Sequence, residues 1–324
     1  MSLPNRPAGI RVSRRSVLAS IPLAAFAVMA ASGCQRTQSR LFGLAATGLD
    51  DATLQRSQAA AQTLGKHLDV LTVYDAFSWE KPLPTALLDA VAATGCTPEL
   101  TWEPWDPGAG KHQGAYTAAQ IAGGRYDIYV RGWAQQAAAY GRRFLLRFAH
   151  EMNGDWYPWS VGAPGGSPQD YVAAYSRVRG IFDDAGAKHV EWVWCPNVII
   201  SGNTEAITKS YPGDQFVDII GVDGYNFGDL PGHQWTQPAD LFAKTLALVT
   251  KLAPGKQVWI NEVGCGDQGG DKARWISDFI AWLVSTDVRA LIWFEVNGTG
   301  GDPDWRLTSS ADTVAAAKSA LASW

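Results

Sequence analysis

Basic charge, histidine and cysteine are all scarce in this sequence of 324 residues. Lys and Arg number 27 against 31 Asp and Glu, and the formal net charge at pH 7 is -4. A chain without a basic excess has no electrostatic footprint for nucleic acid, so we expect no nucleic-acid partner. The His-Glu pair at 150–151 has glycine at 154, where a zinc-protease helix needs a second histidine. We therefore predict no metal site and no cofactor.

The few cysteines exclude a dense disulfide framework. Cys34 falls in the N-terminal segment, which leaves Cys96, Cys195 and Cys265, an odd number that allows at most one internal bridge. Buried free thiols explain these residues equally well. The sequence does not decide between the two.

Long apolar runs are also missing, apart from a short one near the N-terminus. Twin arginines at 14–15 precede an apolar run over 17–31, which is too short to span a bilayer and is typical of a signal-peptide core. "SRRSVLA" resembles a twin-arginine export signal, and "AASGC" resembles a lipoprotein cleavage box that ends at Cys34. We expect export, with a lipid anchor at Cys34 holding the protein to the membrane; the alternative is an ordinary secretory signal. The predicted parts are a signal peptide over 1–34, a short linker over 35–40 and one domain over 41–324, expected to be a monomer.

After residue 40, short apolar runs alternate with amphipathic stretches to the end of the chain. Strands alternating with helices indicate parallel β/α units, and eight such units predict a single-domain (β/α)8 TIM barrel, an α/β fold. A doubly wound sheet is the alternative, but no glycine-rich nucleotide turn follows the first run. The predicted strands are 41–46, 68–74, 97–102, 143–149, 190–195, 217–223, 257–263 and 289–295, and the clearest helices are 51–65, 83–95, 238–255 and 311–321.

Two isolated acids, Glu151 and Glu262, stand at the C-terminal ends of the fourth and seventh predicted strands. Barrel enzymes carry their active sites at these ends. Alternation along a strand places Glu151 on the face of Arg147, and Glu262 on the face of Ile260 and Val258. If both faces look inward, the two carboxylates project into the barrel mouth. One such glutamate alone would suggest a structural ion pair, but two beside aromatic loops favour catalysis.

Fifteen tryptophans are more than core packing alone would suggest, so we expect some to form surfaces that stack on sugar rings. Two carboxyls across an aromatic pocket fit glycoside hydrolysis, in which one acid protonates the leaving oxygen and the other attacks the sugar carbon. A barrel enzyme using its acids for proton transfer is an alternative, but it leaves the tryptophans unexplained.

Four segments at the predicted strand ends, "TWEPW", "RFAHEMNGDWYPW", "GVDGYN" and "WINEVG", resemble glycoside hydrolase family 26. That family contains β-mannanases and some mixed-linkage β-glucanases, and the resemblance covers the chain from about residue 41 to its end. It implies a retaining endo-β-glycosidase, an endo-1,4-β-mannosidase acting on a mannan-type polysaccharide, with Glu151 as acid/base and Glu262 as nucleophile. The alternatives are a β-1,3-1,4-glucanase or exopolysaccharide hydrolase, and a catalytically inactive carbohydrate-binding lipoprotein.

The resemblance also implies contacts with the sugar. His150 would contact the sugar at the cleavage site or orient an acid, and Trp156 is similar to the family's ring platform near the acid. Tyr225 is similar to the tyrosine that hydrogen-bonds the nucleophile. Trp293 is similar to the tryptophan beneath the sugar at the cleavage site. For the three aromatic residues, packing of the barrel rim is the alternative.

Three further residues near the predicted strand ends are candidate sugar contacts. Trp102 and Trp159 either form outer subsites or pack the loops. Asn153 either bonds a sugar hydroxyl or belongs to a turn, because Asn-Gly is a turn signal.

Arg147 raises a question of charge. A cation on the face of Glu151 would favour an ionised carboxylate, whereas an acid catalyst must hold its proton near neutral pH. We therefore predict that Arg147 turns towards Glu262 or another acid of the barrel.

Overall fold

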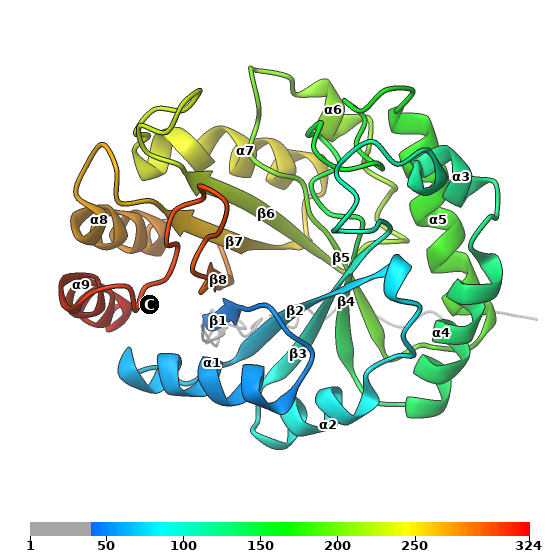
Figure 1. Cartoon of the computed structure of the whole chain (residues 1–324), viewed down its shortest axis with the longest axis horizontal. Helices are drawn as coiled ribbons and strands as arrows, with labels where there is room; N and C mark the ends of the chain where they lie inside the picture. Colours follow the sequence, from blue (N-terminus) through cyan, green and yellow to red (C-terminus); the bar gives the residue numbers. More distant parts are fainter. Residues whose placement is uncertain (1–39) are drawn as a thin grey trace, which may run out of the picture. The chain divides into compact units, whose positions relative to one another are not determined.

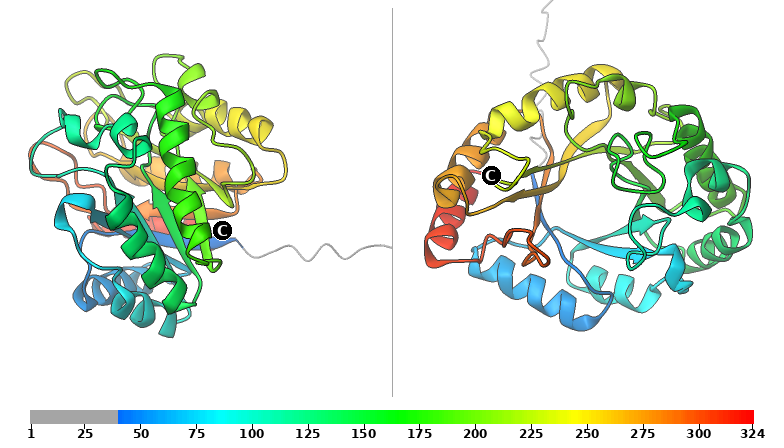
Figure 2. Two further views of the ribbon diagram at one scale, coloured as in Figure 1. Left: turned by 90° about the vertical axis from the view of Figure 1, so that its right-hand side faces the viewer. Right: turned by 45° about the horizontal axis from the view of Figure 1, so that its top comes forward.

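Eight parallel strands close into a barrel in which β1 pairs with both β2 and β8. The computed structural model describes residues 40–324, so the predicted signal peptide and the lipidation at Cys34 lie outside the described residues. Figures 1 and 2 show helices surrounding the strands. The prediction of a (β/α)8 TIM barrel is confirmed. The strands are β1 (Leu41–Ala45), β2 (Val70–Ala76), β3 (Thr97–Glu103), β4 (Phe144–Phe148), β5 (Val190–Trp194), β6 (Ile219–Asn226), β7 (Gln257–Cys265) and β8 (Ala290–Phe294).

Helices follow the strands, and several begin at a side-chain cap. Ser310 accepts a hydrogen bond from the backbone of Thr313 at 3.2 Å and starts α9, whose bounds match the prediction. In the part of the chain that the structure describes, no helix is long and apolar enough to cross a membrane. The helices are α1 (Asp51–Thr63), α2 (Thr85–Ala93), α3 (Ala118–Ala122), α4 (Asp127–Tyr140), α5 (Pro168–Asp184), α6 (Glu205–Thr208), α7 (Pro238–Leu252), α8 (Lys272–Val284) and α9 (Ala311–Leu321), with 3-10 turns η1 (Phe77–Trp79) and η2 (Gly114–Tyr116).

Four strands run further at their C-terminal ends than predicted, β3 by the single residue Glu103 and three others by two or three residues. β2, β6 and β7 extend to Ala76, Asn226 and Cys265, and β6 and β7 stay paired to the last of these residues. The added residues include polar ones, such as Tyr225, whose side chain faces the barrel mouth. A pattern of apolar runs does not detect strand ends of this kind.

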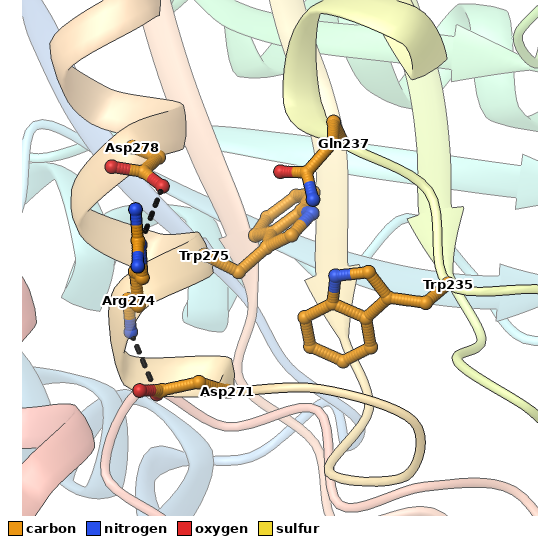
Figure 3. Close-up of a pocket in the computed structure, with 6 residues that line it drawn as sticks. All are labelled: Trp235, Gln237, Asp271, Arg274, Trp275 and Asp278. Carbon is orange, nitrogen blue, oxygen red and sulfur yellow. Dashed lines mark hydrogen bonds and ion pairs between the residues drawn. The ribbon is translucent and has the colours of Figure 1, made fainter.

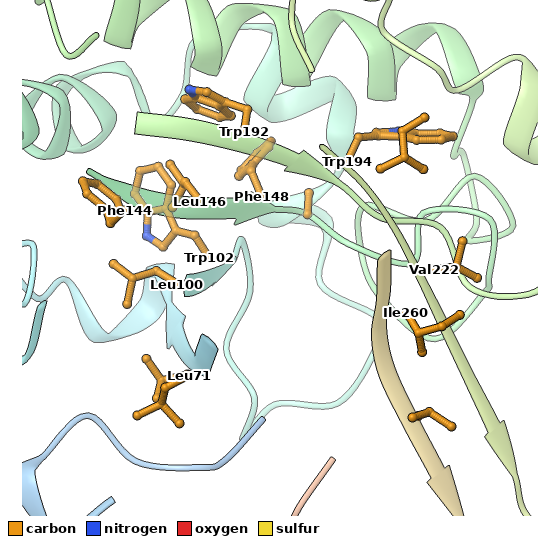
Figure 4. Packing of buried hydrophobic residues seen from close by; sticks show 14 of the residues in the cluster. Leu71, Leu100, Trp102, Phe144, Leu146, Phe148, Trp192, Trp194, Val222 and Ile260 are labelled. Atoms are coloured by element: carbon orange, nitrogen blue, oxygen red, sulfur yellow. The ribbon is translucent and has the colours of Figure 1, made fainter. Parts of the chain in front are cut away.

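The core has two layers, because alternate residues of each strand point inward or outward. The outer layer packs strands against helices, and Figure 4 shows Trp192 and Trp194 projecting from β5 towards the helices. The inner layer fills the barrel with side chains that include Leu145, Val193 and Ile292. Most of the large tryptophan content serves this core, so only a minority of the tryptophans can form the surfaces that we expect to stack on sugar rings. The fully buried tryptophans are Trp102, Trp133, Trp159, Trp192, Trp194, Trp259, Trp275 and Trp293.

A β-bulge on β7 changes the predicted orientation of that strand. Val222 of β6 pairs with Ile260, but the next residue, Asp223, pairs with Glu262, so Asn261 is an extra residue on β7. Ile260 packs in the outer layer.

Within this bulge, both Asn261 and Glu262 reach the barrel interior. The amide of Asn261 donates to both carboxylate oxygens of Glu99 at 3.0 Å, and Glu262 contacts the interior Arg147. Val258 also packs in the outer layer. The prediction that Val258 and Ile260 share an inward face with Glu262 is therefore wrong, although Glu262 itself points inward.

The three cysteines of the described residues, Cys96, Cys195 and Cys265, are free and buried. Of the two interpretations that the sequence left open, the structure shows buried thiols. Burial raises the pKa of the Cys96 thiol to about 12, which keeps it protonated and unreactive at neutral pH.

Asp75 of β2 is a buried acid that is only weakly compensated. Its side chain is fully buried, and neither carboxylate oxygen has a hydrogen-bond partner among the described residues. Burial raises its pKa to about 6, against weaker opposing effects of Lys81 and of the Ala76 backbone. Folding therefore favours the protonated acid, and the stability that this protonation contributes is present in acid and is lost as the pH rises through about 6.

We expect Asp75→Asn to stabilise the protein at neutral pH and to have less effect in acid, because the amide does not ionise. A pKa raised from 3.8 to about 6 corresponds to at most about 3 kcal/mol, or several degrees in Tm. Thermal unfolding at about pH 4.5 and about pH 7.5 measures this difference, with the exposed Asp184→Asn on α5 as control. An equal change in Tm at both pH values would contradict the prediction.

Candidate active site

Glu262 at the C-terminal part of β7 is held by three hydrogen-bond donors. The hydroxyl of Tyr74 donates to Oε1 at 2.5 Å, the hydroxyl of Tyr225 donates to Oε2, and Arg147 donates to Oε1. Only 4% of Glu262 is exposed. These donors fix one orientation of the carboxylate and stabilise negative charge on it. The predicted hydrogen bond between Tyr225 and this acid is present.

Arg147 lies fully buried below the site, and its N–H groups donate hydrogen bonds to residues of the barrel interior. Its guanidinium donates to Thr101 at 2.7 and 2.9 Å, to Asp223 at 2.9 and 3.1 Å, and to Glu262. The prediction that Arg147 turns towards Glu262 or another barrel acid is confirmed, because it contacts both. Burial alone would lower the pKa of Arg147, but the carboxylates of Glu262 and Asp223 raise it above its usual value.

Glu151 reaches the site through an unusual backbone. β4 ends at Phe148, and Ala149 and Glu151 both have left-handed backbone, with φ of 48° and 54°. The Glu151 N–H donates to the carbonyl of Cys195 at 2.7 Å, and Tyr171 donates to the carbonyl of Ala149 at 3.1 Å. The predicted strand over 143–149 therefore ends early. The direction of the Glu151 side chain is set by a turn and not by alternation along the strand.

The side chain of Glu151 accepts two hydrogen bonds. Trp156 donates from Nε1 at 2.6 Å, and Asn197 donates from Nδ2 at 2.7 Å. Asn153 in turn holds Asn197, accepting from its backbone N–H at 2.8 Å and donating to its carbonyl at 2.9 Å. Of the two alternatives for Asn153, the structure shows the turn: the Gly154 N–H donates to the carbonyl of Glu151 at 3.0 Å, and the Asn153 amide is engaged with Asn197.

Glu151 and Glu262 have different electrostatic environments. Burial, followed by the negative charge of Glu262, raises the pKa of Glu151 to about 7, against the smaller effects of its two hydrogen bonds. Arg147 has the least effect on Glu151 of the causes identified, because its guanidinium faces Glu262 and Asp223. At neutral pH, Glu151 is therefore partly protonated and can donate a proton.

A pocket of about 710 Å³ opens beside Glu151. Its walls are mainly aromatic, with one amide and two acids among them, which suits a ligand that has flat apolar faces and hydroxyl edges. The residues that line it are Glu151, Trp156, Tyr157, Asn197, Val198, Ile200, Tyr225, Phe227, Gly232, His233, Phe294, Asp302 and Trp305. Of the predicted sugar contacts, Trp156 and Tyr225 belong to this wall.

Trp293 and Trp102 do not reach the pocket. Trp293 points from β8 towards the helices, where Nε1 donates to the carbonyl of Trp305 at 2.8 Å. Trp102 stacks on Trp133 with the ring centroids 4.2 Å apart. Both are fully buried, so of the alternatives left open for each residue the structure shows packing, and not a platform beneath the sugar at Trp293 or an outer subsite at Trp102. Phe294, one residue beyond Trp293, has the opposite orientation and lines the pocket.

Trp159 and His150 support the pocket from behind. Trp159 is buried, donates to the carbonyl of His150 at 2.7 Å and stacks on Tyr157 at 4.2 Å, so it packs a loop and forms no subsite. His150 Nε2 lies 3.2 Å from the Tyr157 hydroxyl, and burial, followed by the charge of Arg147, lowers its pKa well below the usual value. A neutral imidazole therefore orients Tyr157, and direct contact of His150 with a sugar stays a prediction.

Two other acids at strand ends have different surroundings. Burial, the largest influence, raises the pKa of Glu103 at the end of β3 to about 8, and the charge of Glu262 contributes. Glu103 is thus held mainly protonated near the site. Glu295 accepts from the backbone of Leu307 at 2.8 Å and of Thr308 at 3.2 Å, so it fixes the loop after β8.

The sequence interpretation missed Tyr74, Tyr157, Asn197 and Trp305. Tyr74 continues the inward alternation of β2 and looks like an ordinary core residue in an apolar strand. Asn197 follows β5, an end at which no candidate was sought. A search for polar residues after every predicted strand would have found Asn197, because all eight C-terminal ends meet at one face of a barrel.

Three side chains of the described residues have the geometry of a possible metal site. One ligand atom each of His150, Glu151 and Asp223 lie within 4.8 Å of one another. However, Asp223 is paired with Arg147, and both oxygens of Glu151 accept N–H donors. A cation here would lie near a buried guanidinium, so the donor set does not fit a metal, and the absence of a metal in the reaction stays a prediction.

Comparisons with known proteins agree with the barrel and its paired carboxyls. A sequence model of glycosyl hydrolase family 26 matches residues 98–264. Endoglucanase H of Acetivibrio thermocellus is 33% identical over 267 residues, which are 79% of this chain and 28% of that protein. A mannan endo-1,4-beta-mannosidase of Bifidobacterium adolescentis is 28% identical over 233 residues, 63% of this chain and 23% of that protein. The chain belongs to glycosyl hydrolase family 26, as its motifs predicted.

The chain spans about a quarter of the length of these two curated relatives. Among solved structures, the catalytic domain of the Bacillus sp. JAMB-750 GH26 endo-beta-1,4-mannanase superposes with a TM-score of 0.66 at 17% identity, covering 88% of this chain and 86% of the other. A GH26 beta-mannanase from Bacteroides ovatus gives 0.64 at 18% identity and 88% of both chains. At these identities the likeness concerns the fold.

We expect Trp156→Phe to raise the pKa of Glu151 from about 7 by roughly one unit, because the indole N–H favours the carboxylate. NMR titration of carbon-13-labelled glutamate carboxyls measures it. Trp159→Phe is the control. It removes a hydrogen bond from an indole N–H to the backbone carbonyl of His150, so it should leave the pKa of Glu151 unchanged. Titrations of Trp156→Phe and the parent that coincide would contradict the role of this bond.

We expect Arg147→Ala to lower the free energy of unfolding by about 3–5 kcal/mol, because it leaves buried carboxylates unpaired. Arg143→Ala is the matched control. Arg143 adjoins the same strand and pairs with Glu191 at 2.7 Å, but half of its side chain is exposed, so its loss should cost about 1 kcal/mol or less. Denaturant unfolding of both variants gives the comparison, and equal losses would refute the importance of the buried pairs.

Proposed function

We propose that the chain is a retaining endo-β-glycosidase that cleaves a β-linked polysaccharide, with Glu151 as acid/base and Glu262 as nucleophile. The contrast between the two carboxyls carries the proposal. Glu151 holds a proton near neutral pH at the wall of an aromatic pocket. Glu262 accepts from Arg147, Tyr74 and Tyr225, donors that suit an anion aimed at the sugar. A polysaccharide substrate is also what family membership implies.

In the first step, Glu151 gives its proton to the glycosidic oxygen while a Glu262 oxygen bonds to the anomeric carbon. The bond from the anomeric carbon to the leaving oxygen breaks, and the shortened chain departs. The ester at Glu262 carries no charge, so one cause of the raised pKa of Glu151 disappears. Trp156 and Asn197 donate to the carboxylate that Glu151 has become.

In the second step, the Glu151 carboxylate removes a proton from water as the water oxygen attacks the anomeric carbon. The bond to Glu262 breaks and its carboxylate returns to the donors Arg147, Tyr74 and Tyr225. Two inversions at the anomeric carbon leave the product with the configuration of the substrate. No metal or cofactor enters these steps.

For the substrate we favour a β-glucan, with β-1,4-mannan as the second candidate. The match to a protein named endoglucanase H is more extensive than the match to the mannan endo-1,4-beta-mannosidase, which supports the glucan. Other relatives named as mannan endo-1,4-beta-mannosidases, and the sequence motifs, support mannan. The pocket's aromatic walls suit either hexose. Export and a lipid anchor at Cys34 also stay proposals, which rest on the sequence of residues 1–34 alone.

We expect the purified chain to release oligosaccharides from mixed-linkage β-glucan or from mannan, and less or none from xylan. Glu262→Ala should lose at least about a thousandfold in kcat/KM. The first product detected by proton NMR should be the β-anomer. Comparing the rates of cleavage of glucomannan, pure mannan and pure β-glucan shows which of the two candidate sugars the protein prefers.

Glu151→Ala provides the matched comparison. It should retain activity on substrates with good leaving groups, which need no protonation, whereas Glu262→Ala should not. Absence of products from every polysaccharide would refute the enzyme and favour a carbohydrate-binding protein. Products unaffected by Glu262→Ala would refute the assigned nucleophile, and an α-anomer as first product would refute retention.

A further inference from the structure

A second cavity, of about 450 Å³, lies between the N-terminal turns of α7 and α8. Figure 3 shows two sides to it, with Trp235 and Gln237 opposite Asp271, Arg274 and Asp278. The ring of Trp275 lies between these two groups. None of these residues belongs to the catalytic pocket described above.

The ring of Trp235 is held in place before any ligand binds. A Cβ atom at Gly270 would lie 2.3–2.6 Å from three atoms of the indole, so the ring packs closely on the Gly270 backbone. The backbone N–H of Trp235 donates to Asp229 at 3.2 Å. The next residue, Thr236, accepts at its carbonyl from Trp275 Nε1 at 2.7 Å. Little ordering cost therefore remains for a ligand that uses this ring.

The polar side of the cavity suits a neutral ligand with hydroxyl groups. Arg274 lies 3.5 Å from Asp278, and Asp271 accepts from the backbone N–H of Arg274 at 2.9 Å. Two acids outweigh one cation, which disfavours an anionic ligand. The remaining amide, carboxylate and guanidinium groups are planar donors and acceptors opposite an indole, as at sites that bind sugars.

One loop connects this cavity with the catalytic pocket. Between β6 and α7, Phe227 and His233 line the catalytic pocket, while Trp235 and Gln237 line the second cavity. His233 stacks on Phe227 with the centroids 4.3 Å apart. Ligands on the two sides of this loop are therefore neighbours on the same part of the barrel.

We propose that the cavity around Trp235 is a secondary carbohydrate-binding site, which holds a hexose unit of the polysaccharide outside the catalytic pocket. The ligand class rests on the proposed function. A sugar there lays its apolar face on the Trp235 indole and bonds its hydroxyls to Gln237, Asp271 and Arg274. A long chain bound at this site raises the local concentration of chain at the catalytic pocket.

The test is affinity electrophoresis of the full chain in gels that contain soluble mixed-linkage β-glucan or glucomannan. Glu262→Ala is the background, so that the polysaccharide is not degraded. Adding Trp235→Ala should weaken retardation at least about threefold, as the loss of one aromatic stacking contact predicts. Adding Ile128→Ala, which removes an apolar side chain that is 89% exposed on α4, should change nothing.

Activity measurements separate this site from catalysis. With Glu262 intact, Trp235→Ala should cleave a short oligosaccharide with unchanged kcat/KM but show a raised KM on the long polysaccharide. Trp235→Phe, which keeps a ring, should restore part of the retardation. If Trp235→Ala lowers Tm, the exposed Gln237→Ala gives the same binding test.

The outcomes distinguish the two proposals. A parent that cleaves oligosaccharides, with retardation unaffected by Trp235→Ala and Gln237→Ala, would overturn the secondary site alone. A parent that neither cleaves nor is retarded by these polysaccharides would overturn the proposed function and this site together.

Discussion

The pairing of one buried cation with two buried carboxylates is the constraint on which the site depends. Arg147 on β4 is fully buried, and an unpaired guanidinium there would cost several kcal/mol. It bonds to Thr101 on β3, Asp223 on β6 and Glu262 on β7, so one side chain joins four strands. Because its charge is directed to Asp223 and Glu262, Glu151 keeps the environment of an acid that holds its proton.

The barrel could be predicted from the sequence because eight apolar runs separated by amphipathic stretches admit few other folds. The inward or outward orientation of the side chains of β7 could not be predicted in the same way. Both faces of a barrel strand are buried, so the alternation of Val258 and Ile260 with Trp259 carries no contrast between core and solvent. The extra residue, Asn261, depends on pairing with β6, and local sequence does not record it.

Of the site, the sequence identified the carboxyls but not most of their surroundings. An acid at the end of an apolar strand is conspicuous, as at Glu262, because burying it is costly. An aromatic residue at a strand end can equally well belong to the core. Trp293, for example, faces the helices, whereas its neighbour Phe294 faces the pocket. Asn197 contributes to the site by its hydrogen bond to Glu151, which lies after a different strand. A local sequence pattern cannot show such a contact.

The left-handed backbone at Ala149 and Glu151 places a cost in folding stability at the residue proposed as the acid/base. Each such residue costs about 1 kcal/mol relative to glycine, a cost offset by the hydrogen bonds to Cys195 and from Tyr171. Glycine at 149 would relax the backbone and leave the acid in place. Glycine at 151 would relax it by deleting the acid. Under the proposed function, selection for a more stable protein at this position would remove the acid/base, so the glutamate persists there only while its proton is needed.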